Sequence, residues 1–140
     1  MKLPDVNVWL AAVWARHVHH GRAKAWLDRE DGPVALCRLT QMSLLRLVTN
    51  PAVTGKDALT RRQAWDLADR LLADPRVGFL AEPDDLPRLW AAFSRRDDRD
   101  HLLWTDDYLA AFALGSGAEL VTLDRPLRRR YPSVNVVLLE

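Results

Sequence analysis

The sequence has one cysteine and no long run of apolar residues, and each shortage excludes a class of protein. Cys37 has no partner for an internal disulfide and is expected as a small buried hydrophobe beside Leu36. No apolar stretch approaches the roughly 18 residues that a membrane-spanning helix needs. The segment after Met1 also lacks the apolar core of a secretory signal. We therefore expect a cytoplasmic protein that makes no membrane contact.

Neither sign of charge is in clear excess. The chain has 20 lysines and arginines and 19 aspartates and glutamates, which gives a net charge of +1. This balance argues neither for nor against a nucleic-acid partner. Lysine itself is scarce, so that 17 of the 20 basic residues are arginines, several of them in clusters at 61–62, 95–96 and 125–130. The guanidinium of arginine forms two parallel hydrogen bonds to one phosphate, which the ammonium of lysine cannot do. The clusters support a phosphate-bearing partner, although solvated surface accounts for each cluster equally well.

Short apolar segments alternate with helical patterns along the chain. Five such segments are expected as strands: Lys2–Pro4, Pro33–Leu36, Val77–Leu80, Glu119–Leu123 and Val134–Leu139. In the intervals, Thr40 is expected to cap a helix that ends at Asn50, and Trp65 is expected to face the core. A further helix is expected from Asp106 to Leu114. The pattern predicts a single α/β domain over residues 1–140, with a mainly parallel sheet of about four or five strands flanked by helices.

Three aspartates are placed where parallel α/β proteins build their sites. Asp5 and Asp124 each end an expected strand, and Asp106 begins a helix. Carboxylates packed together repel one another unless a cation lies between them, and hard oxygen ligands select Mg²⁺ or Mn²⁺ over zinc. Such an ion stabilises the charge that develops in phosphodiester displacement. The alternative is that each aspartate only caps a helix.

Four segments, taken in order, resemble one protein family. Leu3–Asn7 is similar to the opening Asp-x-Asn of PIN domains, Thr105–Ala111 to their third-acid helix, and Leu120–Arg125 to the strand that bears their fourth acid. Leu39–Pro51 is similar to the second-helix signature of the VapC half of the VapBC toxin–antitoxin pairs. The likeness runs from about residue 3 to about residue 137. It implies the PIN fold.

The resemblance also implies roles for individual residues. The metal-binding acids of the family fall on Asp5, Asp106 and Asp124, which would hold Mg²⁺ or Mn²⁺ and take part in catalysis. Asn7 would orient Asp5 or a metal-bound water, and Thr122 would form a hydrogen bond within the acidic cluster.

Three further positions depart from the family pattern or extend it. Asp107 stands where a small residue is usual, and is interpreted as either a supporting acid or an exposed aspartate in the first helical turn. Gln41 stands where many relatives have glutamate, so it orients water but cannot act as a general base. We therefore expect one well-held metal ion and a weak or absent second one. Arg46 is expected to neutralise the acids or to bind phosphate, or else to be structural.

The function implied by the resemblance is that of a toxin in a type II toxin–antitoxin system. The chain would be a metal-dependent endoribonuclease that hydrolyses phosphodiester bonds in RNA, with tRNA or rRNA as target. Its partners would be a VapB-type antitoxin and a second copy of itself, in a homodimer and a toxin–antitoxin hetero-oligomer. The antitoxin segment would lie near Trp9 and Trp14, in a groove between early helices.

Two other functions compete with this one. Gln41 motivates a degenerate PIN domain that binds RNA or protein without cleavage. A phosphatase of the haloacid dehalogenase type also has a nucleophilic aspartate at the end of its first strand. That mechanism requires a second acid two residues later, but Asn7 occupies this position. It also requires a lysine beside a late strand, and the chain has none there.

Overall fold

A computed structural model describes residues 1–140 and contains one five-stranded sheet. The strands are β1 (Lys2–Pro4), β2 (Val34–Leu36), β3 (Val77–Phe79), β4 (Glu119–Thr122) and β5 (Val136–Leu138). They lie in the order β3-β2-β1-β4-β5, and every pair is parallel. The predicted parallel α/β sheet is therefore confirmed. Because β1 and β4 are neighbours, residues that follow them emerge at the same edge.

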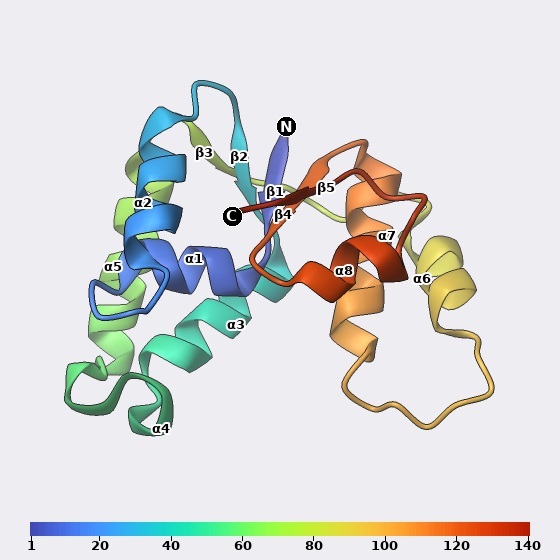
Figure 1. Ribbon diagram of the computed structural model, residues 1–140. Coiled ribbons are helices and arrows are strands. Elements are labelled where there is room, and N and C mark those ends of the chain that lie inside the picture. The colour runs from blue at the N-terminus through green and yellow to red at the C-terminus, as the bar shows by residue number, and fades with distance from the viewer.

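Helices cover both faces of the sheet (Figure 1). One group is α1 (Val6–Val13), α2 (His20–Arg29), α3 (Arg38–Val48), α4 (Pro51–Thr54), the short 3₁₀ helix η1 (Gly55–Asp57) and α5 (Arg61–Ala73). The other group is α6 (Leu86–Ser94), α7 (Trp104–Ser116) and α8 (Arg125–Arg130). The two longest helices have 13 residues, and none is long and apolar enough to cross a membrane.

The apolar core is divided between the two faces of the sheet. Alternation along β2 sends Val34 and Leu36 to the cluster under α1, α3 and α5, while Ala35 joins the cluster under α7. Phe112 of α7 is fully buried in the second cluster, as is Cys37, which agrees with the expected role of that cysteine. The carboxyl-end edge of the sheet therefore lies between two separately packed apolar layers.

Three local predictions were wrong. Thr40 does not cap α3, because the N-cap is Cys37, three residues earlier, and the Thr40 hydroxyl accepts a hydrogen bond from the Cys37 amide. Helix α7 begins at Trp104, so Asp106 is its third residue. Trp65 is 52% exposed, because its neighbours Ala64 and Ala68 take the inward positions of α5.

Candidate functional site

Asp5 and Asp124 lie at the carboxyl ends of paired strands and share one hydroxyl group. The backbone amide of Asp5 donates to the carbonyl of Val121 at 2.8 Å, which fixes Asp5 at the end of β1. Thr122 Oγ1 donates to Asp5 Oδ2 at 3.1 Å and accepts from the Asp124 amide at 3.0 Å. Thr122 therefore ties the two acidic positions together, and its predicted hydrogen bond within the cluster is present.

Asp106 reaches the same region from α7. Its Oδ2 accepts a hydrogen bond of 3.1 Å from Arg130 Nη1, and Arg130 is the last residue of α8. No other basic side chain forms a hydrogen bond or ion pair with Asp5, Asp106 or Asp124. Arg130 is therefore the only cation paired with any of the three carboxylates, and it pairs with Asp106 alone.

Helix capping does not account for these three aspartates. Asp5 and Asp124 occupy the N-cap positions of α1 and α8, but neither side chain accepts a capping hydrogen bond. Asp106 lies inside α7, whose N-cap is Leu103. Each of these carboxylates keeps at least one oxygen free of hydrogen bonds from side chains, so it is available to another ligand, and the geometry favours the site interpretation over the structural one.

The electrostatics show that the carboxylates repel one another. Burial raises the pKa of Asp5, against the opposing effects of the Thr122 hydroxyl and nearby backbone amides, and the charge of Asp124 raises it further. Burial also raises the pKa of Asp106 from 3.8 to about 6, and the charges of Asp5 and Asp124 act in the same direction while Arg130 opposes them. The cluster lacks positive charge, which a divalent cation would supply.

The donor set fits a hard divalent cation in its chemistry. All three side chains offer carboxylate oxygens, the ligand type that Mg²⁺ and Mn²⁺ prefer. In this structure no three acidic, histidine or cysteine side chains form a ready-made metal shell. Asp106 is turned toward Arg130 and Asp5 toward Thr122. Binding a cation therefore requires these side chains, Asp106 above all, to turn toward a common point.

The raised pKa of Asp106 leads to a prediction on pH. In metal-free protein, carboxyl NMR is expected to follow the titration of Asp106 at about pH 6, well above the ordinary 3.8. Because the folded state holds this proton more tightly than the unfolded state, Asp106 is expected to lower the free energy of unfolding as pH rises from about 4 to about 6. Asp106→Asn should remove both effects. A titration of Asp106 at or below pH 3.8 would contradict the claim that burial and the neighbouring carboxylates raise its pKa.

Asp107 is hydrogen-bonded to Tyr131 rather than to any of the three acids. It is buried, and its Oδ1 accepts a hydrogen bond from the hydroxyl of Tyr131, just beyond α8. Burial and the charge of Asp107 raise the pKa of Tyr131, which keeps that hydroxyl protonated as a donor. The interpretation of Asp107 as an exposed aspartate in the first turn was therefore wrong.

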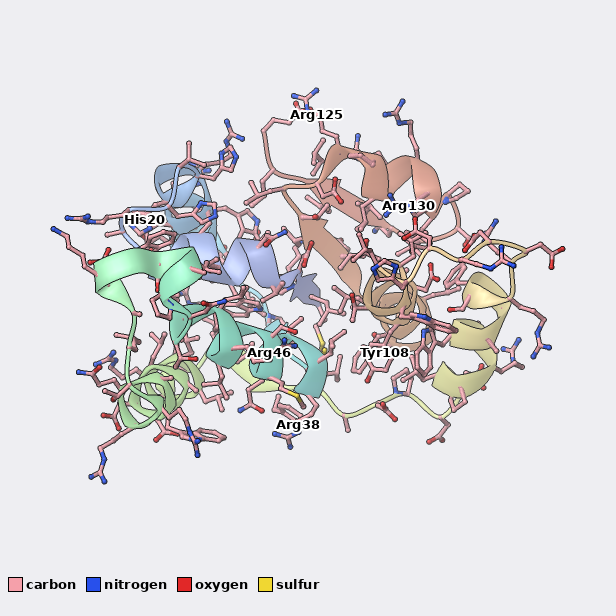
Figure 2. All side chains as sticks on the ribbon, turned by 90° about the horizontal axis from the view of Figure 1, so that it is seen from below. His20, Arg38, Arg46, Tyr108, Arg125 and Arg130 are labelled. Atoms are coloured by element: carbon pink, nitrogen blue, oxygen red, sulfur yellow. The ribbon has the colours of Figure 1, made fainter.

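The other predicted site residues are not drawn into the acidic cluster by hydrogen bonds. The Asn7 side chain is exposed and has no hydrogen-bond partner. Gln41 is buried on α3, with its Oε1 accepting from Arg38 Nη1. Arg46 is exposed beside a groove between α3 and α5. Figure 2 looks at this edge of the molecule and shows Arg46 and Arg130 on opposite sides of the ends of β1 and β4.

Arg130 and Tyr131 were missed as individual site residues by reasoning from the sequence. The arginine run 128–130 was recognised only as a cluster, and nothing in its pattern distinguishes its last member. The residues face α7 because α8 packs back along β5, and Tyr131 is buried against Phe93 with ring centroids 5.3 Å apart. Only the packing of α8 reveals this pair.

The chain matches the family described as PIN domain over residues 2–131. It is 47% identical over 130 residues to Ribonuclease VapC41 of Mycobacterium tuberculosis, with 89% of each chain covered. It is 34% identical over 136 residues to Ribonuclease VapC29 of that species, covering 97% of this chain and 95% of the relative. The chain therefore belongs to the PIN-domain family, in its VapC type.

A solved structure supports the same fold. The crystal structure of VapBC2 from Rickettsia felis bound to a DNA fragment from their promoter aligns with a TM-score of 0.66. The alignment covers 99% of this chain and 98% of that chain, at 14% sequence identity. At this identity the likeness shows the fold alone, and the PIN fold predicted from the motifs is confirmed.

Proposed function

We propose that the chain is an endoribonuclease toxin that hydrolyses phosphodiester bonds in RNA with Mg²⁺ or Mn²⁺ held by Asp5, Asp106 and Asp124. The observation that carries this proposal is the group of three uncapped carboxylates at one sheet edge, with Arg130 as their only paired cation. The relatives named as ribonucleases support the activity. A bound divalent ion supplies Lewis-acid stabilisation of the charged phosphorane-like transition state and lowers the pKa of an attacking water.

The chain's own residues prepare this site. Thr122 holds the carboxylate of Asp5 in a fixed orientation through the 3.1 Å hydrogen bond. Arg130, which pairs with Asp106 Oδ2, would be free to bind a phosphate oxygen of the substrate if Asp106 held the cation. Asn7, exposed in the first turn of α1, would orient Asp5 or a metal-bound water. Arg46 would contact the RNA backbone farther along α3.

The direct test uses the purified chain and total cellular RNA. Discrete fragments are expected with Mg²⁺ or Mn²⁺, and none in excess EDTA, because the carboxylates need the cation to carry the reaction. Returning Mg²⁺ to the EDTA-treated sample should restore cleavage. Fragmentation that proceeds equally in EDTA would contradict metal dependence.

The partners follow from the VapC type. We expect a VapB-type antitoxin to neutralise the chain, and the chain to form a homodimer and a hetero-oligomer with the antitoxin. In the early helices, Trp9 is core, while Trp14 is partly exposed and donates from Nε1 to Asp57 Oδ2 at 2.9 Å. Co-expression with the cognate VapB-type antitoxin should relieve toxicity. Light scattering on the purified chain measures its molar mass, which tests whether it forms a homodimer.

The substrate class is proposed as structured RNA of the cytoplasm, tRNA or rRNA. Proteins that cut RNA selectively read splayed loop bases more readily than duplex edges, and tRNA and rRNA are rich in such loops. Sequencing the fragments from the purified reaction identifies the loop. Cleavage spread evenly over all RNAs would contradict a specific target.

A second candidate function is a degenerate PIN domain that binds RNA or protein without cutting. The glutamine at position 41 favours it, since an amide replaces a negative charge found in many relatives. Calorimetry with Mn²⁺ separates the two functions. Binding of Mn²⁺ together with cleavage supports the nuclease, whereas no heat at millimolar Mn²⁺ and no cleavage supports the degenerate domain.

Gln41→Glu is expected to strengthen a second cation site. The wild-type chain should bind one Mn²⁺ tightly in calorimetry, whereas the variant should show a second binding event, because it adds a carboxylate near the same sheet edge. Met42→Glu is the control, since it adds the same charge at an exposed neighbouring position. Two equally tight ions in the wild type, or the same gain in Met42→Glu, would contradict this role for position 41.

A further inference from the structure

A polar cavity lies beside the acidic cluster, and Arg130 contributes to both. Its volume is about 510 Å³, within the range of pockets that hold small organic ligands. It is formed by the loop of residues 95–103, the start of α7 and the end of α8. Arg130 lines the cavity and also pairs with Asp106, so a ligand in the cavity would lie next to the proposed cleavage site.

One wall of the cavity carries an exposed aromatic ring. Trp104 is 56% exposed, although exposed tryptophan is costly to a soluble protein. Trp90 braces it, because the two ring centroids lie 6.2 Å apart at an interplanar angle of 79°, and Trp90 Nε1 donates to the Trp104 carbonyl at 3.1 Å. An exposed, positioned indole is a stacking platform for a nucleobase.

Basic side chains surround this platform. Arg96, Arg99, His101 and Arg130 all line the cavity. Arg96 Nε donates to the Phe93 carbonyl at 3.0 Å, while Arg99 and His101 have no hydrogen-bond or ion-pair partner in the protein. Free cations at the rim of a cavity suit the phosphates on either side of a bound nucleoside.

The acids of the loop do not cancel these cations by pairing with them. Asp98 Oδ1 accepts from the Asp100 amide at 3.0 Å, and Asp100 Oδ1 accepts from the Leu102 amide at 3.2 Å. Both aspartates therefore shape the loop. The arrangement leaves Arg99 free for a ligand.

An acceptor lies on the floor of the cavity. Asp107 lines it, and only Oδ1 of this carboxylate is engaged, by the hydroxyl of Tyr131. Oδ2 accepts no hydrogen bond from the protein. Oδ2 is therefore a free acceptor, which an N–H group on a base edge can use.

We propose that this cavity binds one unstacked nucleotide of a single-stranded RNA segment next to the scissile phosphate, with the base on Trp104, a base N–H group on Asp107, and the flanking phosphates on Arg99 and Arg130. The inference rests on the proposed function for the identity of the substrate. Trp104 contributes affinity for any base, since every base has a stacking face, whereas Asp107 selects among bases by their donors.

Fluorescence anisotropy with a labelled single-stranded RNA of about ten nucleotides tests the proposal. Binding is measured in EDTA, so that affinity is read separately from cleavage, and a gel verifies that the RNA is intact. Trp104→Ala is expected to raise Kd roughly 5- to 150-fold, the loss expected from one stacked base. Arg99→Ala should weaken binding and make the salt dependence less steep, because one phosphate contact is removed.

Trp65→Ala is the matched control, since Trp65 is 52% exposed but lies on α5 beside the other groove. It should leave Kd unchanged, and circular dichroism establishes that all variants are folded. The proposal is overturned by an unchanged Kd for Trp104→Ala, by an equal loss for Trp65→Ala, or by no RNA binding of the wild type up to millimolar concentration. Trp104-dependent binding together with no cleavage of tRNA or rRNA in Mg²⁺ would keep the cavity and reject the nuclease.

Discussion

Asp5→Asn and Asp106→Asn should each slow RNA cleavage by about 1000-fold or more. The cation contributes several kcal/mol of transition-state stabilisation, and each 1.36 kcal/mol is a factor of ten in rate. An amide keeps the size of the side chain and removes the charge that holds the cation. Single-turnover cleavage of a tRNA or rRNA fragment at saturating Mg²⁺ measures the loss, and growth after induction measures the matching relief of toxicity.

The matched control is Asp69→Asn, which removes an exposed aspartate without a hydrogen-bond or ion-pair partner on α5. It is expected to cut RNA at the wild-type rate. Asp5→Asn should also be at least as stable as the wild type, because a buried carboxylate with a raised pKa is replaced by a neutral group. Wild-type rates in both site variants would reject these residues as cation ligands.

Phe112→Ala is expected to lower the free energy of unfolding by about 3–5 kcal/mol, the range for a large side chain removed from a core. Phe112 is 0% exposed and belongs to the cluster that packs α7 on the sheet. The same helix carries Asp106, so the cavity would loosen the element that brings this acid to the site. Urea unfolding gives the loss of stability, and cleavage rates at increasing temperature show whether activity fails with the fold.

Leu114→Ala is the control on the same helix. Leu114 is 38% exposed, so its truncation removes less buried surface and leaves no closed cavity. A loss below about 1 kcal/mol is expected, as for substitutions outside the core. Equal losses in the two variants would contradict the packing of α7 described above.

The sequence predicted the sheet and two of the three acids well, for a physical reason. Strands of a parallel sheet are short apolar runs, and their carboxyl ends meet at one edge, so Asp5 and Asp124 are located by pattern alone. Asp106 was a candidate from its position near a helix start, but the pattern alone did not show how α7 packs against the strand ends. The hydrogen bond of Thr122 within the cluster was implied by the family resemblance, and the structure shows it to Asp5.

Features that depend on helix packing escaped prediction. The helical pattern predicted that Trp65 faces the core, but two small alanines, Ala64 and Ala68, take the core positions instead of the indole. Asp107 looks exposed in a first helical turn until Tyr131 is seen to donate to it. The same holds for Arg130, whose pairing with Asp106 spans 24 residues. Contacts between distant helices have no signature in local periodicity.

Mapping the 5′ ends of cellular RNA tests most directly whether the three acids form a nuclease site. RNA is collected shortly after induction of the wild-type chain and of Asp106→Asn, in cells without the antitoxin. We predict a few discrete new 5′ ends in tRNA or rRNA loops with the wild type and none with the variant. No new ends with the wild type, or the same ends with both chains, would contradict cleavage by this site.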